Sequence, residues 1–184
     1  MSDDVFAELD GPYSTIVADP PWSYRQSERV QGAVGSQYST MTQQDIADLP
    51  VASLAADDAH LYMWVTVPKL WDSPNPAEIA EAWGFTYKTL ITWVKGERVG
   101  LGWYYRVDTE HVLFCTRGKA PIPGDMRQSN VLWAPRGRHS AKPDAFGDLV
   151  ESVSPGPYVE LFCRRPRLGW DSWGYGYEIV PESA

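Results

Sequence analysis

Short apolar runs recur along the chain, and most of them have the composition of β-strands. They are rich in β-branched and aromatic residues, and polar or Gly- and Pro-containing segments separate them. We expect six strands, at residues 13–18, 60–67, 87–94, 111–116, 130–133 and 158–163.

Helical patterns lie between several of these runs. Thr42 can cap a short helix over residues 42–48, and Asn75 can cap a helix that begins at Pro76 and ends at Gly84. A third helix is expected to open at residues 142–144 and to stop at 154–156. Its apolar positions, at helical spacing, are Phe146, Leu149, Val150 and Val153.

Strands that alternate with helices indicate an α/β sheet with crossover connections. In such sheets, ligands bind beyond the carboxyl ends of the strands. The stretches that follow residues 18, 133 and 163 are therefore the first places to search for a functional site. The polar, Gly-containing stretches 25–37 and 95–102 are expected to be loops at that site.

The composition is that of a soluble globular domain. The chain has 184 residues, of which 43% are apolar and 22% charged, so we expect one domain with a sizeable core. No stretch approaches the roughly 18 apolar residues of a membrane-spanning helix, and the start lacks the features of a secretory signal. Two cysteines inside apolar runs fit a reducing, cytoplasmic location, and no membrane association is expected.

The charge is unevenly distributed. The net charge of −8 arises within residues 1–60, which hold ten Asp and Glu against two Arg, and this argues against a protein that coats nucleic acid non-specifically. Nine of the 16 Lys and Arg lie between residues 117 and 167, so a local basic face and scattered solvated arginines are both open. Nine Trp and ten Tyr fit a core, a base-stacking surface, or both.

The most distinctive chemistry follows the first expected strand, where the chain reads Asp19-Pro20-Pro21-Trp22. Because consecutive prolines lack N–H groups, we expect their carbonyls to project as acceptors without a nearby donor. Asp19 and the Pro20 carbonyl would then accept the two hydrogens of an exocyclic amine on a planar ring, and Trp22 or Tyr24 would stack on that ring. The alternative is a rigid loop with a capping Asp and a core Trp.

Several segments, taken in order, resemble one family. Asp-Pro-Pro-Trp is typical of methyltransferases that act on amino groups of nucleobases. Downstream come Tyr38-Ser39-Thr40-Met41, Arg138-His139-Ser140-Ala141-Lys142-Pro143-Asp144, Glu160-Leu161-Phe162-Cys163-Arg164-Arg165 and Trp170-Asp171-Ser172-Trp173-Gly174. This ordered set resembles the MT-A70 family of N6-adenine methyltransferases.

The resemblance implies a single-domain, Rossmann-like α/β methyltransferase fold over residues 1–184. Its core would cover about residues 13–178, with a mostly parallel central sheet flanked by helices. It also implies S-adenosyl-L-methionine as the cofactor. Carried over position by position, the implied catalytic residues are Asp19, Pro20, Pro21 and Trp22. The implied cofactor-binding residues are Ala18, Asp19, Ser140, Lys142 and Arg164, and the substrate-binding residues are Tyr24, Tyr38 and Trp22.

Two of these positions match family residues with stated roles. Lys142 matches a lysine near the carboxylate of the cofactor, and the alternative of a solvated helix-start lysine is weakened because a helix N-terminus disfavours a cation. Arg164 matches an arginine near the ribose. The chain departs from the family at Tyr175, where members usually carry an Asn that contacts the ribose or adenine, so we assign no ribose contact within residues 165–177.

The implied reaction is methylation of the adenine N6 amine in nucleic acid, with DNA favoured over RNA. Two alternatives are an inactive nucleic-acid-binding scaffold subunit and an enzyme acting on a free nucleotide or small molecule. A second subunit or a homodimer is open as a partner.

Three other features of the sequence say less about function. The histidines and cysteines have no metal-ligand spacing, so no metal is expected. We assign Thr109-Glu110-His111 a structural role. Residues 103–106, Trp-Tyr-Tyr-Arg, are either a base-stacking strip or a packed strand.

Overall fold

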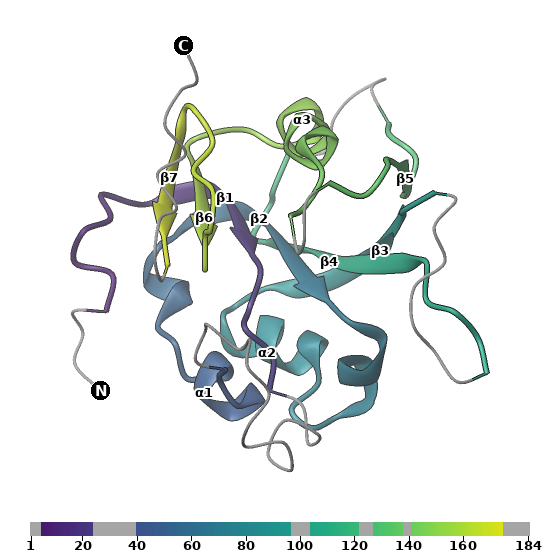
Figure 1. The fold of residues 1–184 in the computed structure, drawn as a ribbon. Helices are drawn as coiled ribbons and strands as arrows, with labels where there is room; N and C mark the ends of the chain where they lie inside the picture. Colours follow the sequence, from purple (N-terminus) through teal and green to yellow (C-terminus); the bar gives the residue numbers. More distant parts are fainter. Residues whose placement is uncertain (1–4, 24–39, 97–103, 122–126, 138–140, 175–184) are drawn as a thin grey trace.

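A computed structural model describes residues 5–23, 40–96, 104–121, 127–137 and 141–174, which build a seven-stranded sheet with helices on both faces (Figure 1). In chain order the elements are β1 (Tyr13–Ala18), α1 (Gln43–Ala47), the 3₁₀ helix η2 (Val51–Ser53), β2 (Ala55–Val65), the 3₁₀ helix η3 (Val67–Trp71), α2 (Pro76–Ala82), β3 (Thr86–Val94), β4 (Thr109–Arg117), β5 (Val131–Trp133), α3 (Asp144–Val153), β6 (Tyr158–Leu161) and β7 (Trp170–Trp173).

The strands lie in the order β5-β3-β4-β2-β1-β6-β7. β1 pairs in parallel with β2 and with β6, and the pairs β6–β7 and β3–β5 are also parallel. β4 is antiparallel to both of its neighbours, β2 and β3. Of the described strands, six therefore run in one direction and β4 alone runs in the other. The predicted α/β class with a mostly parallel sheet is confirmed.

The direction of β4 matters for the site. We call the edge at which the six co-directional strands end the carboxyl edge of the sheet. Because β4 is antiparallel, it begins at this edge, and Thr109 pairs with Val94 at the end of β3. Residues at the start of β4 therefore meet residues that follow the other strands.

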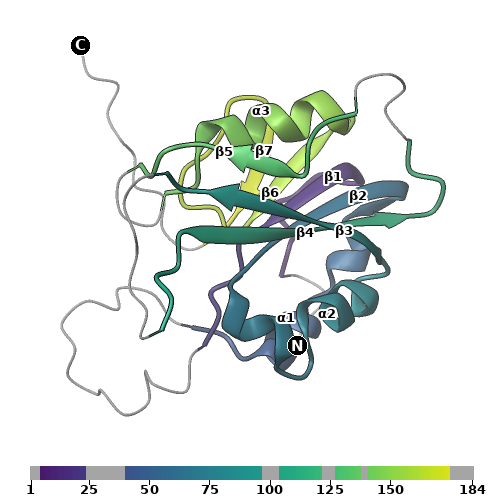
Figure 2. The same ribbon diagram turned by 90° about the vertical axis from the view of Figure 1, so that its right-hand side faces the viewer.

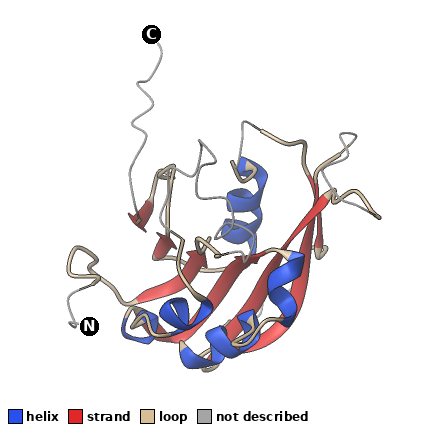
Figure 3. Ribbon diagram, turned by 60° about the horizontal axis from the view of Figure 1, so that its bottom comes forward, coloured by secondary structure: helices blue, strands red, loops and turns tan. Residues whose placement is uncertain are grey.

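The sheet has one hydrophobic layer on each face. Figure 2 shows α1 and α2 on one face and α3 on the other, and Figure 3 shows α1 and α2 lying across the sheet. Side chains of β2 alternate between the layers, as a strand requires. Met63 packs in one cluster with Ile79 of α2, and Trp64 packs in the other, with its ring centroid 4.6 Å from that of Phe146 in α3.

The predicted helix starts are confirmed. Thr42 accepts from the Asp45 N–H, and Asn75 accepts from two backbone N–H groups of the first turn of α2, so both helices begin with a capping box. Pro76 occupies the first turn of α2, where its missing N–H costs no hydrogen bond. α3 starts at Asp144, so Lys142 lies just outside the helix.

The six predicted strands all exist, but a seventh strand is missed and several boundaries differ. β4 begins at Thr109 rather than at residue 111, and β6 ends at Leu161 rather than at residue 163. β2 begins at Ala55, five residues before the expected start. The prediction missed these residues because Asp57 and Asp58 are exposed and interrupt the apolar pattern of the strand. The seventh strand, β7, has only its first residue buried. Its side chains therefore lack the apolar run on which the prediction depends.

Neither cysteine forms a disulfide. Cys115 and Cys163 are both buried, and burial raises the pKa of each thiol to about 12. Within the described ranges, the helices are too short or too polar to cross a lipid bilayer.

A buried polar network joins β2 to the end of α3. The His60 Nδ1 atom lies 2.6 Å from the Ser154 hydroxyl, and the Tyr62 hydroxyl lies 2.7 Å from the same atom. His60 is 2% exposed, and burial lowers its pKa below the usual 6.5. The folded protein therefore holds this imidazole neutral.

We expect the free energy of unfolding to fall as the pH drops below about 6.5. In this range His60 binds a proton in the unfolded state but not in the folded state, where it is buried. A single site of this kind contributes at most about 1.4 kcal/mol per pH unit, and the contribution ends at the lowered folded pKa. Urea denaturation of wild type and His60→Asn across this range measures it. Equal pH slopes for the two chains would contradict the assignment, whatever the variant's absolute stability.

Candidate active site

β1 delivers Asp19 to the carboxyl edge of the sheet. Ala18, the last residue of β1, is fully buried between Met63 of β2 and Leu161 of β6. The Asp19 N–H donates to the Leu161 carbonyl at 3.3 Å. Its carboxylate is only 13% exposed, so the side chain is held at a fixed place where three parallel strands end.

Two cations face the Asp19 carboxylate. The Lys142 Nζ atom lies 3.2 Å from Oδ1, and an Arg164 Nη2 atom lies 3.9 Å from Oδ2. The structure thus brings together three of the predicted site residues from segments far apart in the sequence.

Lys142 bridges two acids. Its ammonium lies 2.9 Å from the Glu110 carboxylate as well as 3.2 Å from Asp19, and it lies 4.5 Å from the ring centroid of Trp64. Burial by itself disfavours the charge, but the two carboxylates outweigh it and raise the pKa of Lys142. These contacts exclude the alternative that Lys142 is a solvated lysine at a helix start.

Glu110 is the site residue that the sequence did not reveal. It comes from the start of β4 and forms ion pairs with Lys142 and with Lys95, the residue that follows β3. Burial opposes the charge of Glu110, yet the two ammonium groups outweigh burial and lower the pKa of this carboxyl. The structural role we expected for Thr109-Glu110-His111 is thus incomplete, because Glu110 also belongs to the charged cluster.

The strand direction explains the omission. A search restricted to residues after strands finds Asp19, Lys95 and Arg164, but it passes over the start of an antiparallel strand. Hydrophobic periodicity carries no information on strand direction. The available signal was an acidic residue just before the apolar run Val112–Cys115 of this strand.

One expectation about the prolines is wrong. The Trp22 N–H donates to the Pro20 carbonyl at 2.9 Å, and the Met41 N–H donates to the Pro21 carbonyl at 2.9 Å. Both carbonyls therefore have a backbone donor, because the turn folds back on itself and residue 41 lies beside it. Each oxygen keeps a second lone pair, so Pro20 can still accept one more hydrogen bond.

Trp22 anchors the turn. Its indole N–H donates to the Trp64 carbonyl at the end of β2, at 3.1 Å, and the residue is 6% exposed within the main hydrophobic cluster. The stacking role expected for Trp22 does not fit this placement, because a buried indole offers no face to a base. Tyr24, Tyr38 and Ser140, the other predicted contacts, lie outside the described residues.

The end of β6 adds a further acid. Burial, and then the Asp19 charge, raise the pKa of Glu160 to about 7, and the Cys163 thiol lies 3.6 Å from its carboxylate. Phe162 follows in the left-handed region, with φ of 62°, and this sharp turn lets the Cys163 N–H donate to the Trp173 carbonyl. Such a backbone costs roughly 1–2 kcal/mol in a non-glycine residue. The turn directs Arg164 back toward Asp19.

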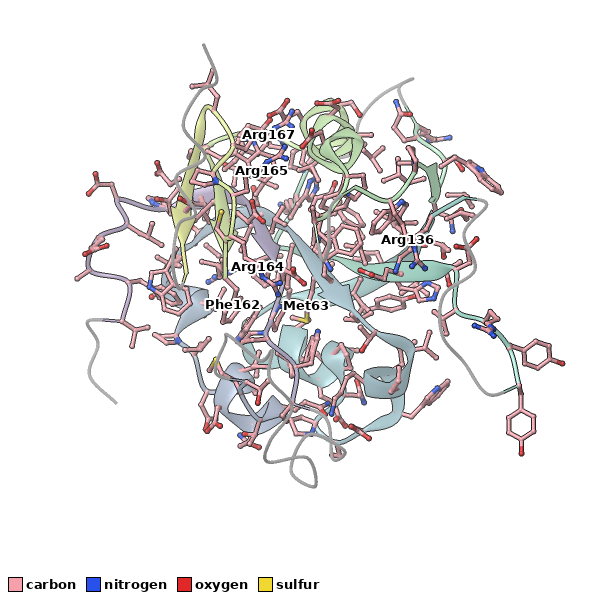
Figure 4. All side chains as sticks on the ribbon, in the orientation of Figure 1. Met63, Arg136, Phe162, Arg164, Arg165 and Arg167 are labelled. Atoms are coloured by element: carbon pink, nitrogen blue, oxygen red, sulfur yellow. The ribbon has the colours of Figure 1, made fainter. Side chains whose placement is uncertain are left out.

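The neighbouring arginines, Arg165 and Arg167, form ion pairs with α3 instead of with Asp19. Figure 4 shows Arg164 beside Met63 and Phe162 near the ends of β1 and β2, whereas Arg165 and Arg167 lie against α3. Arg165 pairs with Asp144, and Arg167 pairs with Asp148 and Glu151. For these two arginines the structure favours scattered surface cations over a basic binding face, the two alternatives that the sequence left open.

The cluster has a clear chemical capacity. Asp19 and Glu110 alternate with Lys142 and Lys95 along the carboxyl edge, and Arg164 borders Asp19. An alternating set of this kind can hold a zwitterion and can accept hydrogen bonds from an amine. In the part of the chain that the structure describes, no three His, Cys, Asp or Glu side chains are grouped to hold a metal ion.

Comparison with known proteins gives relatives over most of the chain. It is 34% identical to the type II methyltransferase M.MunI of Mycoplasma sp, over 94% of this chain and 81% of that protein. It is 28% identical to the human N(6)-adenine-specific methyltransferase METTL4 and 30% identical to the N6-methyladenosine RNA methyltransferase MTA1 of Pyricularia oryzae. Each of these alignments covers 88% of this chain, but only 37% of METTL4 and 46% of MTA1.

The model of one family matches residues 13–176, which include every element described above from β1 to β7. The match covers the Asp19 turn, Glu110 and Lys142 together. The chain belongs to the MT-A70 family of N6-adenine methyltransferases.

Proposed function

We propose that this protein transfers a methyl group from S-adenosyl-L-methionine to the N6 amine of adenine in nucleic acid, with DNA favoured over RNA. The observation that carries the proposal is the Asp19 carboxylate, fixed at the carboxyl edge and flanked by Lys142. M.MunI, which this chain spans over 81% of its length, is named a type II methyltransferase, whereas the chain spans only 46% of the RNA methyltransferase MTA1 of Pyricularia oryzae.

Asp19 is proposed to act on the amine. The adenine amine is a poor nucleophile because its lone pair is delocalised into the ring. A hydrogen bond from N6–H to Asp19, and a second one to the free lone pair of the Pro20 carbonyl, would localise the nitrogen lone pair. Asp19 would also receive the proton that N6 releases, directly or through water. Holding the amine in line supplies a further large share of the rate, up to about 7–11 kcal/mol of the barrier.

The residues fit the proposed cofactor. When bound, S-adenosyl-L-methionine supplies a methyl group on a sulfonium, and its methionine part carries one carboxylate and one ammonium. Lys142 offers a cation, and Asp19 with half-buried Glu160 offers carboxyl groups for an ammonium or for ribose hydroxyls. Arg164 lies on the β6 side of Asp19 and would face the adenosine part.

Lys142→Ala is expected to weaken cofactor binding by about 10- to 100-fold, because a charge-assisted hydrogen bond contributes roughly 1.5–3 kcal/mol. Isothermal titration calorimetry with S-adenosylmethionine measures the dissociation constant. Lys88→Ala, at an exposed position in the first half of β3, is the matched control and should bind as wild type does. An unchanged dissociation constant in Lys142→Ala would show that the lysine does not touch the cofactor.

The function is tested by methyl transfer from labelled cofactor to adenine-containing single- and double-stranded DNA and RNA. Nucleoside digestion and mass spectrometry identify the product, and N6-methyladenine in one pool supports the reaction and names the polymer. No product with intact cofactor binding would indicate a missing partner subunit or a small-molecule substrate. Loss of both would favour an inactive scaffold.

A further inference from the structure

Residues 104–108 form a short strip that leads into the active site. The sequence left residues 103–106 open as either a base-stacking strip or a packed strand. The structure excludes a packed strand for the two tyrosines, because β4 begins only at Thr109 and Tyr104 and Tyr105 are 97% and 88% exposed. Figure 1 shows this segment running away from the body of the sheet at the start of β4.

The base of the strip is firmly attached. The Asp108 carbonyl accepts from the Lys95 N–H at 3.0 Å, and the Val107 carbonyl accepts from an Arg136 Nη2 atom at 3.2 Å. Arg136 also lies 3.8 Å from the Asp108 carboxylate. Lys95 is the residue whose side chain pairs with Glu110, so the strip is tied directly to the charged cluster.

A third exposed aromatic residue lies at the same edge of the sheet. Trp133, at the end of β5, is 75% exposed and pairs in register with Val94, which in turn pairs with Thr109. Two strand spacings of about 4.8 Å put the backbones of Trp133 and Thr109 roughly 10 Å apart. The aromatic residues and the active site therefore share one border.

We propose that Tyr104, Tyr105 and Trp133 are an aromatic platform for the bases that flank the target adenine in the nucleic-acid strand. This rests on the proposed function. An adenine that reaches Asp19 must leave its stack, and its neighbours then lose a stacking partner that an aromatic ring replaces. Arg106 follows the two tyrosines in the strip, and Arg136 lies at its base, where Asp108 balances part of its charge. This local positive charge favours a phosphate-bearing strand over a second protein chain.

The reach of the strip agrees with this role. Tyr105 is five residues before Glu110, and a fully extended segment of that length spans at most about 18 Å. Bases along one strand are spaced at about 3.4 Å, so the tyrosines lie within about five nucleotides of the reacting adenine. Within the described residues, neither tyrosine has a hydrogen bond or a ring contact that would fix it to the protein.

The test uses the full chain and a fluorescein-labelled single-stranded oligonucleotide with one central adenine, made as DNA and as RNA. Fluorescence anisotropy gives the dissociation constant for wild type, Tyr104→Ala/Tyr105→Ala and Tyr104→Phe/Tyr105→Phe. The alanine pair should bind about 10- to 100-fold more weakly, whereas the phenylalanine pair keeps its rings and should stay close to wild type. Tyr87→Ala, an exposed tyrosine at the far end of β3, is the control and should bind as wild type does.

A second readout separates stacking from catalysis. In the alanine pair the KM for the oligonucleotide should rise, while cofactor affinity and the KM for adenosine monophosphate, which has no flanking bases, stay unchanged. Equal oligonucleotide affinity in wild type and the alanine pair would overturn the platform. If the alanine pair instead loses self-association at unchanged oligonucleotide affinity, the surface is a protein interface and the proposal is wrong. Binding through the tyrosines without methyl transfer would overturn only the proposed reaction.

Discussion

Asp19→Ala should lower kcat for methyl transfer by about 10²- to 10⁴-fold, the range for loss of a positioned proton acceptor. The carboxylate is the proposed contact of the amine. It follows a strand whose last four residues are buried, so a neighbouring side chain has little freedom to replace it. The fold should survive, because the Asp19 N–H bond to Leu161 does not involve the side chain. Stopped-time assays at saturating cofactor and substrate measure kcat.

Two further variants make the result interpretable. Asp19→Asn keeps one acceptor oxygen but loses the charge, so its rate should lie between those of wild type and Asp19→Ala. Asp144→Ala removes a carboxylate that is 71% exposed and paired with Arg165 on the surface, and its rate should equal that of wild type. A kcat of Asp19→Ala within a few-fold of wild type would contradict the proposal that Asp19 contacts the reacting amine.

Glu110→Ala should lower the free energy of unfolding by about 2–3 kcal/mol, and kcat should fall with it. Glu110 lies between Lys95, which is 11% exposed, and Lys142, which is 24% exposed, and its loss leaves two poorly hydrated cations facing each other. Removing one partner of a buried ion pair costs about 3–5 kcal/mol, and partial exposure reduces that figure here. We expect kcat to fall because Lys142 then pairs with Asp19 alone and occupies its carboxylate.

The double variant Glu110→Ala/Lys95→Met distinguishes charge from packing. Deleting the orphaned Lys95 charge should restore part of the lost stability, so the two effects should be non-additive. Urea denaturation measures the free energy of unfolding of each variant. If the pairing of Lys142 with Asp19 alone lowers kcat, the double variant should be as slow as Glu110→Ala. Strict additivity would contradict a direct interaction between Lys95 and Glu110.

Sequence reasoning was strongest where local chemistry constrained the chain. The apolar run of β1 and the prolines at 20 and 21 fix the strand end and the turn, so Asp19 was placed correctly. Lys142 was identified through its match to the family motif, and the unfavourable place of a cation just before a helix only weakened the alternative of a solvated lysine. Asn75 and Pro76 marked the start of α2, since both act on the helix backbone directly.

The sequence did not predict features that depend on contacts between segments far apart in the chain. The occupied Pro21 carbonyl depends on residue 41, twenty residues away, and the burial of Trp22 depends on the carbonyl of Trp64. The role of Glu110 depends on the direction of β4, which no local pattern encodes. Short β7 escaped notice because a polar edge strand carries too few buried side chains to produce a signal.

The interior position of β1, between β2 and β6, has a consequence for biosynthesis. Thr15 pairs with Tyr158, about 140 residues later in the chain, and a ribosome takes roughly 7–28 s to make that length. Until then one edge of this strand, which ends in the buried apolar residues Ile16, Val17 and Ala18, has no partner, and an unpaired strand edge is a template for association with other chains. The nascent protein should therefore depend on chaperones that shield this strand, and expression with chaperone depletion should yield aggregates rather than a folded intermediate.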